Sequence, residues 1–358
     1  MKQTMIYITL WSLSLLKSPA AISIENYHHG KHQTIATINC PQKQDTEGRK
    51  YLSMTMMHTN ETFNELRSNV HVFNKLSNEQ IMMAMKSMGP NYYWTLDKQD
   101  PDQTTGALIL AHGYGKDGDR SFRNSMEPLS SKYITSLSLG MSMMTSKHIE
   151  CALLDMQQKG AENIYVVPIS SSSRNSLIQQ WEYIFGLRND HAYTKVRSVQ
   201  MDNVVFLNPI DDHLIAKQII FDFAQEISMN PGNEVVIIIA HGPVSKTNNE
   251  FELELLENIA IYIREYGKFN DVRAFTIQDD APKEIRNTNI NQIRECIEEA
   301  SLNGNSVLMV SNLMSGKGIQ KKIYDDFSGL DYKFNPKGFL NHPRFNEWIL
   351  QSIESNHN

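Results

Sequence analysis

Two stretches of the chain each send an apolar run into Ala-His-Gly. The first, ALILAHG, ends at Gly113, and the second, VVIIIAHG, ends at Gly242. Continuous apolar runs of this length are typical of parallel strands that are covered on both faces. A glycine after the histidine lets another group approach the backbone closely. The two runs therefore predict two equivalent strand ends, which present His112 and His241.

The sequence around these histidines repeats with constant spacing. The interval from His112 to His213 is 101 residues (213 − 112), and the interval from His241 to His342 is the same (342 − 241). Each later histidine precedes an amphipathic helical pattern, HLIAKQI in the first case and HPRFNEWI in the second. Agreement in order, spacing and flanking sequence indicates two copies of one structural unit.

Within each copy, apolar runs alternate with helical patterns. This alternation is typical of an α/β fold in which helices cover both faces of a parallel sheet. The sequence therefore predicts two tandem three-layer α/β units with parallel sheets, over residues 105–230 and 231–358, and an N-terminal helical extension.

Residues 1–21 have the composition of a secretory signal peptide. One lysine precedes a short apolar run, and small residues follow as far as Ala21. The run is too short for a membrane span. We therefore expect cleavage and a periplasmic or secreted protein, with an uncleaved N-terminal anchor as the alternative.

Residues 22–104 separate this signal from the first unit. The polar part before about residue 60 predicts a flexible linker, and apolar residues at helical spacing predict a helical segment over 61–88. The aromatic stretch NYYWTL is expected to pack on the first unit. Three histidines of the linker could hold a metal weakly or belong to a solvated tail: His28, His29 and His32.

Composition argues against several functions. The net charge is −6 and lysines and arginines do not cluster, which argues against a nucleic acid partner. GYGKDGD does not have the P-loop spacing, so no nucleotide site is predicted. Three cysteines, Cys40, Cys151 and Cys296, are too few for a disulfide framework. The last two fall in helical patterns, so we expect them to be small buried apolar residues.

These features resemble the class II tetrapyrrole chelatases, in their sirohydrochlorin cobaltochelatase (CbiX-like) branch. The resemblance covers residue 106 to the end. It is carried by the two His-Gly pairs, by the strand that ends at Val167-Pro168, and by Asp212-His213 and His342-Pro343 before the last helix of each half.

The resemblance implies a bilobal fold with a tetrapyrrole in the cleft between the halves. It implies that a divalent metal ion, Co²⁺, Fe²⁺ or Ni²⁺, is inserted without a nucleotide. His112 and His241 would be metal ligands and proton acceptors, roles that suit a neutral imidazole. Gly113 and Gly242 would lie against the tetrapyrrole.

Asp279 and Asp280, in FTIQDDAP, are the carboxylates expected near His241. Imidazole with carboxylate suits a first-row divalent ion; alternatively, the two aspartates cap the loop before Pro282. In the first copy the residues expected near His112 are softer, and they could be ligands or packing residues: Met141, Met143, Met144 and His148.

Hydroxyls and cations follow the third strand of each copy. Ser172 and Arg174 in the first copy, with Lys317 at the matching place in the second, could bind the carboxylates of a tetrapyrrole. Alternatively, these segments are solvated loops.

The predicted function is that of an exported metal chelatase, a lyase that acts on a tetrapyrrole. The resemblance implies a second histidine after the strand that ends at Pro168, but ISSSSRN follows Pro168 and the next histidine is His191. This departure keeps an alternative open. The alternative is a non-catalytic periplasmic carrier of a metal or a tetrapyrrole, which kept the cleft but lost part of the ligand set.

Overall fold

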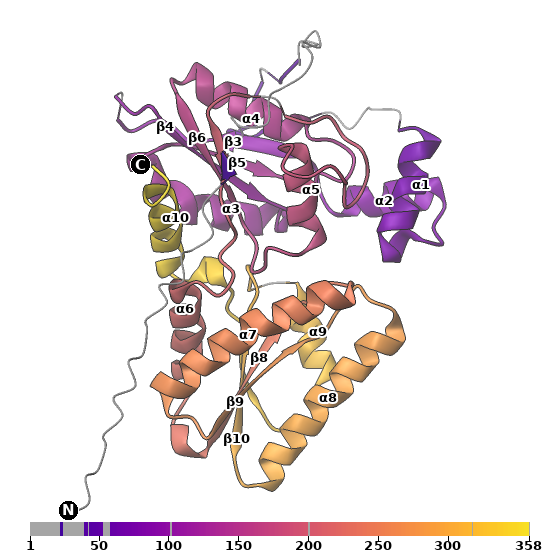
Figure 1. Ribbon diagram of the computed structural model, residues 1–358, viewed down its shortest axis with the longest axis vertical. Coiled ribbons are helices and arrows are strands. Elements are labelled where there is room, and N and C mark those ends of the chain that lie inside the picture. The colour runs from indigo at the N-terminus through magenta and orange to yellow at the C-terminus, as the bar shows by residue number, and fades with distance from the viewer. Residues whose placement is uncertain are drawn as a thin grey trace, which may run out of the picture.

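Two α/β lobes, each built on its own sheet, make up most of the chain (Figure 1). The computed structural model describes residues 22–23, 39–41, 43–52, 58–100, 102–199, 201–316 and 318–357. The predicted signal peptide, the three linker histidines and Lys317 lie outside the described residues.

Four parallel strands form the centre of the first sheet. They are β4 (Thr105–Ala111), β5 (Ile134–Leu139), β6 (Asn163–Pro168) and β7 (Val204–Phe206). They lie in the order β7-β6-β4-β5, and each neighbouring pair is parallel.

The residues before the first unit extend this sheet at both edges. β3 (Tyr92–Thr95) pairs antiparallel with β5, and β2 (Lys50–Tyr51) pairs antiparallel with β3. β1 (Ile22–Ser23) pairs antiparallel with β7 at the other edge. The prediction of a flexible linker is therefore wrong for the β1 and β2 segments. The aromatic stretch packs on the first unit as expected, and it does so as a strand.

The second sheet contains four parallel strands in the order β11-β10-β8-β9. Three of them, β8 (Glu234–Ala240), β9 (Asp271–Thr276) and β10 (Ser306–Ser311), follow the predicted apolar runs. The fourth, β11 (Lys333–Asn335), was not predicted because three residues with an exposed lysine carry no apolar pattern.

Helices cover both faces of each sheet. Along β8, alternate residues enter two different cores, with Val236 and Ile238 in one and Ile237 and Ile239 in the other. The predicted three-layer α/β class is confirmed. The helices that flank the first sheet are α3 (Gly115–Met126), α4 (Lys147–Gln158) and α5 (Ser176–Ile184), and those that flank the second are α7 (Lys246–Gly267), α8 (Lys283–Leu302) and α9 (Ile319–Asp326).

The last helix of each copy packs on the lobe of the other copy. α6 (Leu214–Gln225) contacts α7 and β10, and Asn335 of β11 donates a hydrogen bond to Phe223 O at 3.0 Å. α10 (Arg344–Glu354) lies beside the first lobe, where Asn346 donates to Ser125 O at 2.6 Å (Figure 1). The unit boundary at residue 230 therefore stays a prediction about the sequence repeat. In the structure, the last helix of each sequence copy packs against the lobe of the other copy.

The N-terminal extension contains two helices instead of one continuous segment over 61–88. α1 (Asn60–Asn69) ends where Val70 adopts an extended backbone, and a 3₁₀ turn over His71–Phe73 follows. α2 (Asn78–Ser87) starts at Ser77, which forms a capping box with Gln80. The apolar spacing continues through both helices, so it gives no indication of the break. Among the described helices, none is long and apolar enough to cross a membrane.

A disulfide joins Cys40 to Cys151 of α4, which corrects the interpretation of Cys151 as a small buried apolar residue alone. Cys151 is buried as predicted, but its partner lies 111 residues earlier, a separation that no local pattern reveals. Cys296 is buried and free. Lys50 of β2 forms an ion pair with Asp155 of α4 at 2.6 Å, so a second contact fastens the extension to this helix.

The disulfide predicts the thiol count of the protein. Denatured without reductant, the chain should react with one equivalent of a thiol reagent, Cys296, and after reduction with three. Cys151→Ser should lower the free energy of unfolding by about 2–5 kcal/mol, because the crosslink no longer restricts the unfolded chain. Cys296→Ser is the control that leaves the crosslink intact, and three reactive thiols before reduction would contradict the pairing.

Candidate functional site

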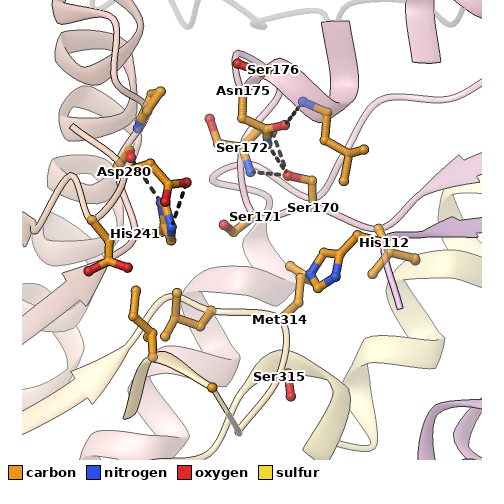
Figure 2. A pocket seen from close by; sticks show the side chains of 18 of the residues that line it. His112, Ser170, Ser171, Ser172, Asn175, Ser176, His241, Asp280, Met314 and Ser315 are labelled. Carbon is orange, nitrogen blue, oxygen red and sulfur yellow. Dashed lines mark hydrogen bonds and ion pairs between the residues drawn. The ribbon is translucent and has the colours of Figure 1, made fainter. Parts of the chain in front are cut away.

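The two histidines lie on the wall of one cavity of about 650 Å³ between the lobes. His112 follows β4 and His241 follows β8, so both extend from the carboxyl ends of central parallel strands, where ligand sites of open α/β sheets form. Figure 2 shows His241 and Asp280 on one side of the cavity, His112 on the other, and the serines of the segment after β6 between them.

His112 sits in a tight turn and is poorly solvated. Gly113, with φ +90°, makes the turn that residues with a Cβ rarely adopt. The imidazole lies against the ring of Tyr114, with 4.8 Å between the ring centroids. Burial lowers the pKa of His112 below its usual value, so the ring is neutral at pH 7. A neutral imidazole in a cavity can accept a proton.

His241 is more exposed, and its hydrogen bond orients its ring. Nδ1 lies 3.1 Å from Gly242 O, which can only accept, so Nδ1 carries the proton. Nε2 lies 3.6 Å from Oδ2 of Asp280, an ion pair when the ring is protonated and a pair of facing lone-pair donors when it is neutral. Two electron-pair donors that face each other are the arrangement that a cation between them would stabilise.

Asp279 completes a cluster of three potential metal ligands. One donor atom from each of His241, Asp279 and Asp280 lies within 4.8 Å of the others. The Asp279 side chain is 7% exposed and forms ion pairs with Lys322 at 2.5 Å and Arg286 at 3.0 Å. Burial alone would raise the pKa of Asp279, but hydrogen bonds from Lys322 and Arg286 outweigh it and lower the pKa.

The hydroxyl-rich segment after β6 lines the cavity where the family pattern would place a further histidine. Ser170 Oγ donates to Ser172 O at 2.9 Å, and Asn175 donates to Ser172 O at 2.8 Å. Of the predicted carboxylate binders, Ser172 lines the cavity. Arg174 packs over the ring of Phe251 at 4.0 Å, and among the described residues of the second copy Lys322 of α9 contributes a cation to the cavity wall.

Glu252 was missed by the sequence reasoning. It extends from α7, is 4% exposed, and is hydrogen-bonded to the backbone of Gly242 and the side chain of Ser172. Burial raises the pKa of Glu252 to about 7. A sequence signal was present, because Glu252 shares its helix face with the buried Leu255, Leu256 and Ile259.

The remaining candidates are packing or capping residues. Met141 lines the cavity, but Met143, Met144 and His148 are buried beside it in the core of the first lobe. Burial lowers the pKa of His148 to about 3. His213 accepts a hydrogen bond from Ile215 N at 3.2 Å and so caps α6, in agreement with its predicted place at the helix start.

The raised pKa of Glu252 predicts how stability depends on pH. The unfolded carboxyl loses its proton near 4.5 and the folded one near 7, so the free energy of unfolding falls as pH rises through this interval. The fall should amount to about 3 kcal/mol. Glu252→Gln should abolish it, whereas Glu254→Gln, an exposed residue of the same helix, should not. Urea unfolding at pH 4.5 to 8 measures this, and parallel curves for Glu252→Gln and the wild type would contradict it.

Comparison with known proteins supports the fold. No family model and no curated protein matches the chain. Among solved structures, SirB from Bacillus subtilis with Fe³⁺ is 15% identical with a TM-score of 0.53, and the match covers 71% of this chain and 96% of SirB. CbiX, the terminal enzyme for biosynthesis of siroheme in denitrifying bacteria, is 14% identical with a TM-score of 0.44, covering 70% and 98%. DR2241 from Deinococcus radiodurans, a multi-domain protein with structural similarity to chelatases, is 17% identical with a TM-score of 0.43, covering 70% and 54%. The chain has a chelatase-like fold.

Proposed function

We propose that the chain is a chelatase that inserts a divalent metal ion into a tetrapyrrole bound between the lobes. The observation that carries the proposal is the meeting of His241, Asp279 and Asp280 on the wall of the cavity that also contains His112. Imidazole and carboxylates suit Co²⁺, Fe²⁺ or Ni²⁺. The cavity, of about 650 Å³, lies within the range of small-molecule sites.

Insertion of a divalent ion into the ring of four nitrogens would release two protons, one from each of the two N–H groups of the free tetrapyrrole. His112, which burial keeps neutral, accepts one proton. Glu252 lines the same cavity, and its pKa of about 7 suits it to accept the other. His241 Nε2 and Asp280 would hold the incoming metal across the cavity from His112, and the ion pair of Asp279 with Lys322 stabilises that wall of the cavity.

Polar side chains of the cavity would hold the carboxylates of the tetrapyrrole. Ser171 and Ser172 supply hydroxyl groups, and Lys322 supplies a positive charge. Gly113 and Gly242 lie on the cavity wall and leave room for the macrocycle. We assign no part in binding to Arg174, because its guanidinium packs on Phe251.

A non-catalytic carrier of the metal or tetrapyrrole is the second candidate. The observation that favours it is the segment after β6, where Ser170, Ser171 and Ser172 line the cavity and no histidine does. Serine hydroxyls do not accept protons at neutral pH. A carrier would bind its ligand in this cavity without accelerating the exchange of protons for metal.

The insertion reaction separates the two functions. Mixing the protein with sirohydrochlorin and Co²⁺ should change the absorption spectrum faster than the spontaneous reaction does.

His112→Ala should lower the rate about 10²-fold or more, because it removes the proton acceptor. His241→Ala and Asp280→Asn should weaken Co²⁺ binding about tenfold or more, because the first removes a ligand and the second removes the negative charge of one. His213→Ala, which changes a capping histidine away from the cavity, is the control.

Tetrapyrrole binding with no rate above the spontaneous one would replace the enzyme by the carrier. If neither His112→Ala nor His241→Ala alters binding or rate, the assignment of the site is wrong.

We also propose that the mature protein works outside the cytoplasm. The signal-like composition of residues 1–21 suggests this. The Cys40–Cys151 disulfide supports it independently, because disulfides persist in oxidising compartments.

Protein isolated from its native cells should begin near residue 21 or 22 when its N-terminal sequence is determined. An intact Met1 in the membrane fraction would favour the uncleaved anchor. An intact Met1 in the soluble cytoplasmic fraction would contradict export.

A further inference from the structure

Asp119 is a buried carboxylate next to the turn that carries His112. It belongs to α3 and is 6% exposed. Its Oδ1 accepts a hydrogen bond from the backbone N–H of Tyr114, and its Oδ2 accepts one from the hydroxyl of Tyr92 at 2.7 Å. A buried carboxylate needs such donors, since an unpaired charge in the interior is strongly unfavourable. The two bonds tie the start of α3 to strand β3.

The bond to Tyr114 acts on the position of His112. Tyr114 is two residues after His112, and its ring packs against the imidazole. Between them, Gly113 has φ +90°, so the turn relies on hydrogen bonds and packing to hold one conformation. Asp119 supplies the hydrogen bond that fixes the backbone immediately after this glycine.

The bond to Tyr92 connects the turn to the N-terminal extension. Tyr92 is buried in β3, the strand that precedes the first unit and pairs with β5 (Figure 1). Arg49 directly precedes β2, and its guanidinium lies 5.9 Å from the centre of the Tyr92 ring. Neither Tyr92 nor Asp119 is among the described residues that line the cavity, so neither contacts a substrate there.

We infer that Asp119 and Tyr92 are positioning residues that hold the His112 turn and make the N-terminal extension part of the site. The role of His112 as proton acceptor rests on the proposed function. The hydrogen bonds of Asp119 and Tyr92 do not depend on that function. The chelatase-like lobe therefore depends on a strand from outside it for the geometry of its proton acceptor.

Two variants remove one or both of these hydrogen bonds. Tyr92→Phe keeps the ring and loses one bond, and Asp119→Ala loses both. We expect kcat for metal insertion to fall about tenfold for Tyr92→Phe and about a hundredfold for Asp119→Ala, because a small displacement of a catalytic group has effects of this size. KM should stay within about twofold, since neither side chain contacts the tetrapyrrole. Asp119→Asn keeps an acceptor for Tyr114 and should recover most of the rate.

Matched controls come from the same lobe. Tyr165→Phe removes a buried hydroxyl that donates to Asn356 O at 3.1 Å, and Glu150→Ala removes the ion pair between a buried carboxylate of α4 and Arg197 at 3.1 Å. Both alter packing or polar contacts of the first lobe away from the His112 turn. They should leave kcat unchanged, even where the denaturation midpoint falls as far as in the positioning variants.

The ring signals of His112 in an NMR spectrum of the full chain provide a readout that needs no turnover. They are identified by their loss in His112→Gln. Asp119→Ala and Tyr92→Phe should shift or broaden them, and the two controls should not. Unshifted signals overturn the inference, whether or not the wild type inserts metal. Absent insertion with shifted signals overturns the proposed function and leaves the inference standing.

Discussion

The continuous packing of α6 and α10 across the two lobes is the constraint on which the site depends. One hydrophobic core includes Phe223 of α6, Trp348 of α10 and strand residues of both sheets, such as Val167 and Val236. Burial of each large apolar side chain contributes about 1.5–3 kcal/mol. Because each lobe is covered by a helix of the other copy, the lobes cannot separate without exposing this core. The ends of β4 and β8 therefore face one shared cavity in a fixed arrangement.

Within this cavity, the carboxyl groups divide into two kinds according to their partners. Asp279 is buried against Arg286 and Lys322, so it stays charged. Glu252 is equally buried, but its hydrogen-bond partners Gly242 and Ser172 are neutral, so its proton leaves only near pH 7. The same cavity thus contains carboxyl groups suited to a cation and a carboxyl group suited to exchange a proton. A reaction that exchanges a metal ion for protons needs both kinds.

The sequence predicts the elements that local patterns determine and misses the contacts made over long distances. The strands that end at His112 and His241 were evident, because apolar runs and a constant spacing identify them. The approach of Asp279 and Asp280 to His241 followed from the rule that ligands gather at the carboxyl ends of parallel strands. The exchange of α6 and α10 could not be predicted, because an amphipathic face fits either sheet equally well. The bond between Cys40 and Cys151 was equally hidden.

The N-terminal extension shows why the boundary of a repeated unit need not be the boundary of a site. Its strand β3 brings the Tyr92 hydroxyl to Asp119, and without that donor a buried carboxylate would lose one of its two hydrogen bonds. Leaving a buried polar group unsatisfied costs about 1–3 kcal/mol. The loss would destabilise the segment that orients His112, because the other hydrogen bond of Asp119 is accepted from Tyr114 of that segment. The disulfide and the Lys50–Asp155 ion pair hold the extension on α4. They therefore stabilise β3 where Asp119 requires it, and the extension and the site are structurally linked.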